Sequence, residues 1–376
     1  MVEAAGLRAP RRACVGFAVA ILMFCASSHP EAPASPEKVE STTLRQLYAG
    51  PPPTWPAPEL DAGVAFVEFG ERPRKAPPTE RTRALAALGK QLFFDPSLSR
   101  DGTVACSHCH DPARGWSDGR PVSAGVGGLR GRRNAPSLFG LDHAGLWGWT
   151  GRTTDLRAQL AAPLFDPLEM ANEDIAAVAR SLDRSPGYRE AFSRRFPEAE
   201  GVTIEGIGEA LEAYLAGIDE TTRFDAFLAG DKAALSDIEI TGLHLFRTKA
   251  RCANCHFGPR LSDGFFHNLR LSFFGEPAED RGRYDVTGRL EDVGRFRTPS
   301  LRQVVRTAPY MHNGLFADLR GVINLYDRGG GEVWARNAGE AANPLNPHAQ
   351  RLSPHIRKLG LSDDEKAALL AFLSTL

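Results

Sequence analysis

Four cysteines in the body of this chain form two pairs, and each pair is followed directly by a histidine. The first motif is Cys106-Ser107-His108-Cys109-His110 and the second is Cys252-Ala253-Asn254-Cys255-His256. With this spacing, the two thiols can add across the two vinyl groups of one haem, and the adjacent histidine becomes the proximal iron ligand. The sequence therefore predicts two covalently bound c-type haems, with iron held by His110 and His256.

Two other uses of a CxxC pair stay open at this stage. A zinc site would combine two such halves, usually within about 20 residues of each other, whereas these pairs lie far apart in the chain. A thioredoxin-like redox pair would lie in a βαβ pattern, and neither pair is surrounded by one. The other cysteines, Cys14 and Cys25, lie near the N-terminus.

Residues 1–28 have the order of a secretory signal peptide: a basic stretch, an apolar run from Ala13 to Phe24, and then small residues. The apolar run is too short to span a membrane. We therefore expect export to the periplasm and no stable membrane span. Lipid anchoring at Cys25 is not expected, because the bulky Phe24 precedes it. The net charge of -1 argues against nucleic acid as a partner.

Helical patterns surround both cysteine motifs. Apolar residues recur at helical spacing from Leu85 to Phe93, ahead of the first motif, and a capping box at Ser236–Glu239 opens a helix that leads to the second. No convincing alternating strand pattern is present. Further helices are expected at Glu173–Leu182, Ile204–Leu215, Leu319–Tyr326 and after Ser362.

This organisation predicts an all-α fold with two related, cytochrome c-like helical domains, each carrying one covalent haem. The first haem domain would span residues 79–225 and the second residues 226–376. Residues 29–78 are rich in proline, and we expect an extended tether or a segment draped over the surface, because proline cannot continue a helix or a central strand.

From about Leu85 to the C-terminus, the chain resembles the bacterial dihaem cytochrome c peroxidases, including the MauG branch. The resemblance implies that the haem on His110 is the peroxidatic one and that the haem on His256 stores and relays an electron. It rests on five ordered motifs, Arg133–Ser137, Trp149–Arg152, Pro163–Met170, Thr298–Arg302 and Thr307–Gly314.

The same resemblance assigns three further roles. Trp149 resembles the electron-transfer bridge between the haems, Gln159 matches the distal glutamine, and Glu169 matches the distal acid–base carboxylate. A carboxylate can move a proton from the inner to the outer peroxide oxygen, and an amide can orient bound peroxide. Judged as single residues, they could equally be a core aromatic, a surface residue and a helix-start carboxylate.

Two departures from the family pattern affect the haem ligands. Classical members of the family carry a histidine in the loop after the first motif, whereas residues 111–133 here contain none, and the corresponding stretch is Ala124–Gly128. We therefore expect a five-coordinate, high-spin first haem even in the fully oxidised protein. The second haem would take Tyr326 as its sixth ligand, as in the MauG branch, in place of a methionine. Met311 is the rival ligand.

The resemblance also implies one calcium ion between the domains, at Asn134, Thr307 and Pro309. The leading functional interpretation is a peroxidase that reduces hydrogen peroxide with electrons from a small donor protein, such as a cytochrome c or a cupredoxin. A second interpretation is a MauG-like oxidase that modifies residues of a partner protein. A third is a non-enzymatic dihaem electron carrier.

Overall fold

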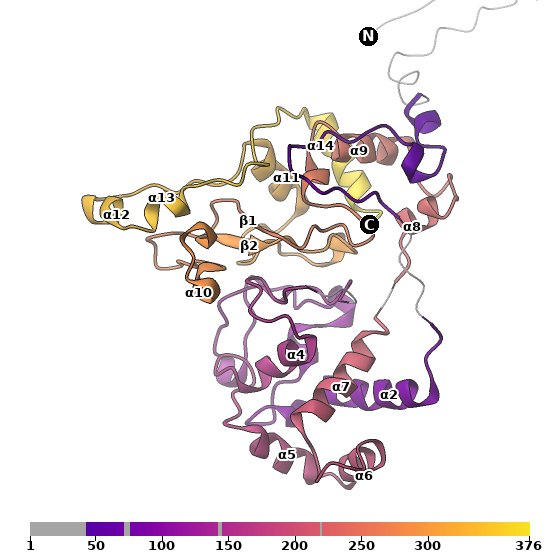
Figure 1. Cartoon of the computed structure of the whole chain (residues 1–376), viewed down its shortest axis with the longest axis vertical. Helices are drawn as coiled ribbons and strands as arrows, with labels where there is room; N and C mark the ends of the chain where they lie inside the picture. Colours follow the sequence, from indigo (N-terminus) through magenta and orange to yellow (C-terminus); the bar gives the residue numbers. More distant parts are fainter. Residues whose placement is uncertain (1–42, 71–75, 142–144, 219) are drawn as a thin grey trace, which may run out of the picture.

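The computed structural model describes residues 43–70, 76–141, 145–218 and 220–376, and the expected signal peptide lies outside these ranges. Buried apolar side chains form two large clusters. One is built from residues between Leu88 and Ile218, and the other mainly from residues between Phe224 and Leu376. Figure 1 shows the corresponding two bodies of helices and loops. The chain passes from one cluster to the other just ahead of the boundary expected from the sequence.

The first body contains the helices α2 (Glu80–Phe94), α3 (Cys106–Cys109), α4 (Leu156–Phe165), α5 (Ile175–Asp183), α6 (Pro186–Arg195) and α7 (Ile204–Leu215). The second body contains α8 (Arg223–Leu228), α9 (Asp237–Arg247), α10 (Tyr284–Thr287), α11 (Leu319–Asp327), α12 (Ala338–Ala342), α13 (Asn346–Ala349) and α14 (Asp363–Leu373). Short 3₁₀ helices lie at Pro52–Thr54, Pro96–Leu98, Pro112–Arg114, Val126–Gly128, Cys252–Asn254, Leu290–Asp292 and Val304–Arg306.

The helix-rich fold agrees with the sequence prediction, and α7 has the predicted bounds. The capping box of α9 is also confirmed, since the Ser236 N–H donates to Glu239 Oε2 at 2.7 Å. Helix α4 was missed because Pro163 lies inside it, and proline normally ends a helix. The strands β1 (Phe266–Asn268) and β2 (Arg295–Arg297), which pair antiparallel, were also missed. Three residues are too few to show a period of two.

In each body, one pair of helices packs unusually closely at a glycine. A Cβ atom on Gly89 of α2 would lie 1.8 Å from the Ala210 carbonyl oxygen of α7. A Cβ atom on Gly242 of α9 would lie 2.0 Å from the Ala368 carbonyl oxygen of α14. Both glycines belong to the helix that precedes a CxxCH motif. The two bodies therefore share one packing device, which agrees with the expectation of two related helical units.

Residues 43–70, which we call the strap, pack against the second body. Tyr48, Trp55 and Phe69 have exposed fractions of 0%, 6% and 2% and belong to its core cluster. The Glu59 N–H donates to the Arg247 carbonyl oxygen (2.9 Å), and the Asp61 N–H donates to Asn254 Oδ1 (2.7 Å), inside the second CxxCH motif. This part of the proline-rich segment is thus an extended segment draped over the second body, one of the two forms expected, because most of its residues are exposed or half-buried. Its aromatic side chains help to form the core.

A buried ion pair fastens the strap to α9. The Arg247 side chain is fully buried, and its guanidinium donates to Glu68 Oε1 (2.5 Å) and Oε2 (2.9 Å). The same guanidinium lies 5.5 Å from the Trp55 ring and 5.4 Å from the Phe69 ring, within the range of cation–π attraction. Because α9 leads directly to Cys252, the strap supports the helix that positions the second motif.

The two bodies meet through polar contacts around Trp149. Arg133 of the first body forms a bidentate ion pair with Asp280 of the second. Its Nε donates to Oδ2 at 2.7 Å and its Nη2 donates to Oδ1 at 2.8 Å. The Arg297 N–H of β2 donates to the Trp149 carbonyl oxygen at 2.8 Å, and Arg283 Nη1 donates to the Thr150 carbonyl oxygen at 3.0 Å. Trp149 therefore lies where the two bodies touch. Within the described ranges, no helix has both the length and the apolar character needed to cross a membrane.

Candidate haem and peroxide site

The first CxxCH motif is compact. Cys106 and Cys109 are the ends of α3, and the His110 N–H donates to the Cys106 carbonyl oxygen at 3.0 Å. His110 Nδ1 lies 3.0 Å from the Trp116 carbonyl oxygen. A carbonyl only accepts hydrogen bonds, so Nδ1 carries the proton and Nε2 keeps its lone pair for a metal. His108, between the two cysteines, is exposed.

The second motif repeats this arrangement. The His256 N–H donates to the Cys252 carbonyl oxygen (2.9 Å), and His256 Nδ1 lies 2.9 Å from the Leu261 carbonyl oxygen. Burial lowers the pKa of both His110 and His256, which favours the neutral imidazole that binds iron. Both histidines therefore have the tautomer and the protonation state of a proximal haem ligand.

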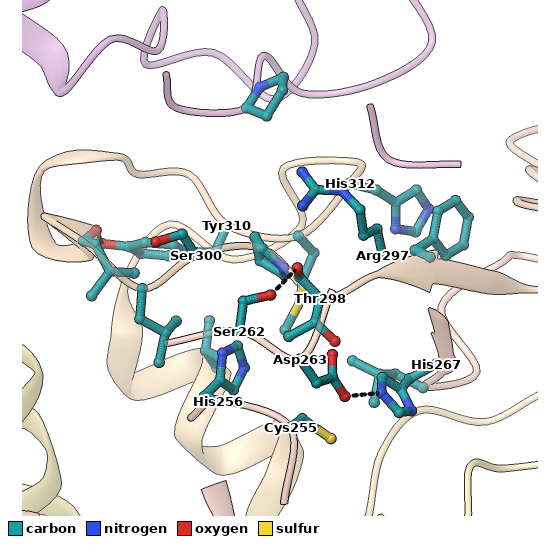
Figure 2. A pocket seen from close by; sticks show the side chains of 18 of the residues that line it. Cys255, His256, Ser262, Asp263, His267, Arg297, Thr298, Ser300, Tyr310 and His312 are labelled. Atoms are coloured by element: carbon teal, nitrogen blue, oxygen red, sulfur yellow. Dashed lines mark hydrogen bonds and ion pairs between the residues drawn. The ribbon is translucent and has the colours of Figure 1, made fainter. Parts of the chain in front are cut away.

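Cys252, Cys255 and His256 face a large cavity, shown in close-up in Figure 2. Its volume is about 640 Å³, within the range of ligand and cofactor sites. Among the described residues, the candidate metal group is Cys255, Asp263 and His267, so the two cysteine pairs do not come together at one ion. The cavity, the thiols and the free Nε2 together fit a covalent haem and do not fit the zinc alternative.

The predicted ligand Tyr326 lines this cavity, and so does its rival Met311. Tyr326 belongs to α11, and its pKa is raised by burial and, to a smaller extent, by the nearby Cys255 and Cys252 thiols. The phenol is therefore close to the second motif. Met311 lies in a loop with a positive φ of 73°. The cavity brings both candidate sixth ligands to the haem site.

Glu169 lies in the turn after α4 and is half-buried. Burial raises its pKa, the Asp166 charge raises it further, and Arg152 lowers it. Burial is also the main cause of the raised pKa of the Cys106 thiol (about 12), and Glu169 contributes to that shift. Glu169 is therefore close to the first motif and is a weaker acid than an exposed glutamate, which suits proton transfer near neutral pH.

The loop stretch that replaces the family's histidine packs directly on Glu169. The Val126 N–H donates to the Glu169 carbonyl oxygen at 2.8 Å. A Cβ atom on Gly125 would lie 2.3 Å from that oxygen and 2.2 Å from the Leu168 carbonyl oxygen, so only glycine fits there. Val126 is 3% exposed. This stretch offers backbone and an apolar side chain, and no imidazole.

Gln159 is located on α4, and its Oε1 accepts a hydrogen bond from Arg152 Nε at 3.2 Å. Arg152 also acts electrostatically on Glu169. One arginine therefore connects the two residues expected on the distal side. The sequence analysis assigned Arg152 no role, although it is the last residue of the Trp-x-Gly-Arg motif. The presence of Arg152 in this motif could have pointed to a functional role for it.

The residues expected at a calcium site gather at the body interface. Asn134, Thr307 and Pro309 line the same cavity as Trp149. Asn134 Nδ2 donates to the Arg120 carbonyl oxygen (2.7 Å), so Oδ1 is the amide atom that can bind a cation. Trp149 Nε1 donates to the Asn134 carbonyl oxygen at 2.9 Å. The predicted bridging tryptophan and the predicted cation ligand are thus directly linked.

Three histidines outside the two motifs have side-chain partners. His267 Nε2 pairs with Asp263 Oδ2 at 2.8 Å, as Figure 2 shows, and His355 Nδ1 pairs with Asp61 Oδ2 at 3.0 Å. His244 Nδ1 lies 3.1 Å from the Tyr48 hydroxyl. His143 lies outside the described residues.

Comparisons with known proteins agree with this geometry. A family profile described as Di-haem cytochrome c peroxidase matches residues 83–233. Cytochrome-c peroxidase IdrP2 of Denitromonas iodatirespirans is 32% identical over 320 residues, which is 78% of this chain and 81% of the relative. Methylamine utilization protein MauG of Paracoccus denitrificans is 35% identical over 350 residues, covering 78% and 88%. A solved MauG-like protein associated with microbial copper homeostasis has a TM-score of 0.69 and 34% identity, covering 85% and 95%.

Proposed function

Because this chain belongs to the di-haem cytochrome c peroxidase family, we propose that it reduces hydrogen peroxide at the haem on His110, with electrons relayed through the haem on His256. The family makes the chain a peroxidase with two c-type haems. The observation that carries the finer proposal is the half-buried Glu169 beside the first motif, with a raised pKa. The reaction consumes one peroxide, two electrons and two protons and yields two waters.

The haem iron supplies the open position for peroxide and the redox chemistry that breaks the O–O bond. The protein supplies the proton transfer. Glu169 takes the proton from the inner peroxide oxygen and returns it to the outer one, so that the leaving oxygen departs as water. Gln159 orients the peroxide through its amide N–H groups, because its Oε1 is already bonded to Arg152.

Electrons reach this site from a small donor protein through the second haem and Trp149. The location of Trp149 at the body interface, with its backbone bonded to β2, supports this role. We propose that a calcium ion at Asn134, Thr307 and Pro309 holds the two bodies in register, since oxygen ligands suit this ion. The proposal includes export to the periplasm, where such donor proteins are found.

The oxidised protein is expected to contain one high-spin haem, because the loop that packs on Glu169 carries Gly125 and Val126 and no histidine. The measurement is an electron paramagnetic resonance spectrum of the purified, fully oxidised protein. One high-spin and one low-spin ferric signal are expected. A spectrum with low-spin signals alone would mean that another side chain binds the first iron.

The variant Tyr326→Phe is expected to change the low-spin spectrum of the second haem, since the ring would still fill the cavity wall but the donor oxygen would be lost. Met311→Leu is the matched control and should leave the spectrum unchanged. Electronic and magnetic resonance spectra of both variants decide the matter. The reverse pattern would assign the ligand to Met311.

A second candidate function is MauG-like oxidation of residues on a partner protein, and the presence of Tyr326 at the second haem favours it. A tyrosinate oxygen is a harder donor than a thioether and lowers the potential of the haem. A turnover assay with a reduced small cytochrome separates the two functions. Rapid peroxide reduction supports the leading proposal, and failure with every small donor supports the protein-modifying role. A pure electron carrier would turn over no peroxide at all.

A further inference from the structure

Three aromatic side chains of the first body are in mutual contact beside the first motif. The Trp116 ring lies 5.7 Å from the Phe93 ring and 6.3 Å from the Tyr214 ring, measured between centroids. The Phe93 and Tyr214 rings are 5.4 Å apart, and all three separations are typical of interacting aromatic pairs. The Trp116 carbonyl oxygen also accepts the hydrogen bond from His110 Nδ1 at 3.0 Å. This aromatic cluster therefore begins at the expected proximal ligand of the first haem.

The close crossing of α2 and α7, visible in Figure 1, places Tyr214 in the aromatic cluster. A Cβ atom on Gly89 of α2 would lie 2.9 Å from the Tyr214 Cβ atom of α7. Phe93 lies four residues after Gly89, on the same face of α2, and so meets the Tyr214 ring. Tyr214 is half-buried, and its ring lies 6.4 Å from the ring of Phe94, which is 41% exposed. The cluster therefore reaches the surface of the protein.

The second body repeats this arrangement with a leucine in the place of Trp116. The Leu261 carbonyl oxygen accepts the hydrogen bond from His256 Nδ1 at 2.9 Å. Both residues also have a positive φ, 62° for Trp116 and 56° for Leu261, which is uncommon for residues other than glycine. The two positions therefore correspond in backbone conformation and in their contact with the histidine of the motif. They differ only in the side chain.

The same correspondence puts a phenylalanine in the place of Tyr214. A Cβ atom on Gly242 of α9 would lie 2.7 Å from the Phe372 Cβ atom of α14, as one on Gly89 would lie beside Tyr214. The leucine and the phenylalanine of the second body are buried, whereas the tryptophan and the tyrosine of the first body are half-buried. Packing at these two positions is thus satisfied by a leucine and a phenylalanine. It does not explain why the first body has a tryptophan and a tyrosine.

Redox chemistry explains the difference. Tryptophan and tyrosine are side chains that a strong oxidant can oxidise by one electron, whereas leucine and phenylalanine resist such oxidation. Burial raises the pKa of Tyr214, so its hydroxyl is protonated at neutral pH and must release a proton when the ring loses an electron. Because Tyr214 is only half-buried, that proton can pass to water. Trp116 and Tyr214 can therefore move an oxidising equivalent from the side of His110 to the surface.

We propose that Trp116 and Tyr214 carry oxidising equivalents from the first haem site to the surface, where Tyr214 oxidises small phenols by one electron. This inference rests on the proposed function, because hydrogen peroxide is the oxidant. An electron passes from Tyr214 through Trp116 toward the first haem site, and the phenolic proton of Tyr214 leaves to water. A phenol then gives Tyr214 one electron and one proton, so its own O–H bond breaks and that of Tyr214 forms again. One peroxide and two phenols thus yield two waters and two phenoxyl radicals.

Phenols suit this site because their O–H group resembles that of Tyr214, so the transfer of one electron and one proton between them needs little driving force. The exposed ring of Phe94 beside Tyr214 also offers an aromatic surface on which a flat, uncharged phenol can stack. The site is separate from the body interface, where Trp149 is expected to admit electrons from a donor protein. The protein would therefore accept electrons at two places.

The variants Tyr214→Phe and Trp116→Phe test the route, since each keeps a ring in the aromatic cluster and removes the oxidisable group. The probe is guaiacol, a small phenol whose peroxide-dependent oxidation by the full-length holoprotein is followed by absorbance. Each variant should lower the guaiacol rate by at least about tenfold. Tyr284→Phe, at a half-buried tyrosine of the second body, is the matched control and should keep the wild-type rate. Tyr214→Phe should keep its turnover with a reduced small cytochrome.

A second measurement does not depend on turnover. Electron paramagnetic resonance spectra are recorded on samples frozen directly after mixing with hydrogen peroxide in the absence of any donor. A tyrosyl radical signal is expected in the unmodified protein and in Tyr284→Phe. It should be absent from Tyr214→Phe and much weaker in Trp116→Phe, because the tryptophan lies between Tyr214 and the first motif.

The outcomes separate this inference from the proposed function. A tyrosyl signal that persists in Tyr214→Phe, or no such signal in the unmodified protein, would overturn the route. Guaiacol rates that stay unchanged in both phenylalanine variants would overturn the phenol site. With normal cytochrome turnover, either result leaves the proposed function intact. If the unmodified protein reduced no peroxide with any donor, both the proposed function and this inference would be wrong.

Discussion

Replacing Glu169 by glutamine is expected to lower the turnover number for hydrogen peroxide by about 10²–10⁴-fold, the usual contribution of a general acid–base group. The amide has nearly the shape of the carboxylate but cannot take the peroxide proton. Glu169 is held by its own backbone bonds to Asp166 and Val126, so the variant should keep the fold. The measurement is steady-state oxidation of a reduced small cytochrome by peroxide, normalised to haem content.

The rate of the same reaction is expected to fall at low pH. Burial, together with the charge of Asp166, raises the pKa of Glu169. The Glu169 carboxylate must be ionised to accept the peroxide proton. Activity should therefore fall as the pH drops through this raised pKa, and the fall should come at a higher pH than for an exposed glutamate. Glu169→Gln should lack this acidic limb. The exposed Glu173 provides a matched control, and Glu173→Gln should keep both the rate and the limb. Unchanged turnover in Glu169→Gln would leave a plain electron carrier as the better explanation.

Removing the carboxylate of Glu68 is expected to destabilise the second body by about 3–5 kcal/mol, the usual cost of leaving a buried charge unpaired. Arg247 is fully buried, and Glu68 is the carboxylate that pairs with it. The strap would lose its main polar contact with α9, whereas the aromatic contacts around the guanidinium would remain. Guanidinium unfolding of the holoprotein, followed through the second-haem spectrum, measures the change.

Two controls make this result specific. Lys249 forms an ion pair with Glu365 at 2.7 Å close to the end of the same helix, its side chain is 43% exposed, and Lys249→Ala should cost only about 0–1 kcal/mol. The double variant Glu68→Ala with Arg247→Met removes both charges and should be more stable than Glu68→Ala alone. Equal losses in Glu68→Ala and Lys249→Ala would show that the buried pair contributes no more than an ordinary surface pair.

The helical framework could be predicted wherever a period or a cap was present. The apolar stripe of α7 and the capping box of α9 are short-range patterns, and both helices were found in the expected places. The strap was expected as an extended segment, but its aromatic anchors could not be predicted. Tyr48, Trp55 and Phe69 follow no period, so nothing in their spacing reveals that they enter the core of a body that begins more than 150 residues later.

The residues of the candidate site likewise fall into those that the sequence predicted and those that it did not. Two residues were not predicted from the sequence: Arg152, which links Gln159 with Glu169, and His312, which stacks on Phe296 and meets Trp149 edge-on. Both lie inside motifs that had been noticed. Their partners come from other parts of the chain, so their roles depend on distances that a motif does not contain. The catalytic roles of Glu169, Gln159 and Trp149 stay predictions.

The sequence by itself determined the covalent chemistry of this protein, because two thiols and a histidine within five residues of chain meet one haem through local geometry alone. Only the tertiary structure decided how each motif is completed. The burial that raises the pKa of Glu169 and the meeting of Trp149 with His312 both depend on residues far apart in sequence. Burial and long-range contact are properties of the packed chain, and no local spacing records them.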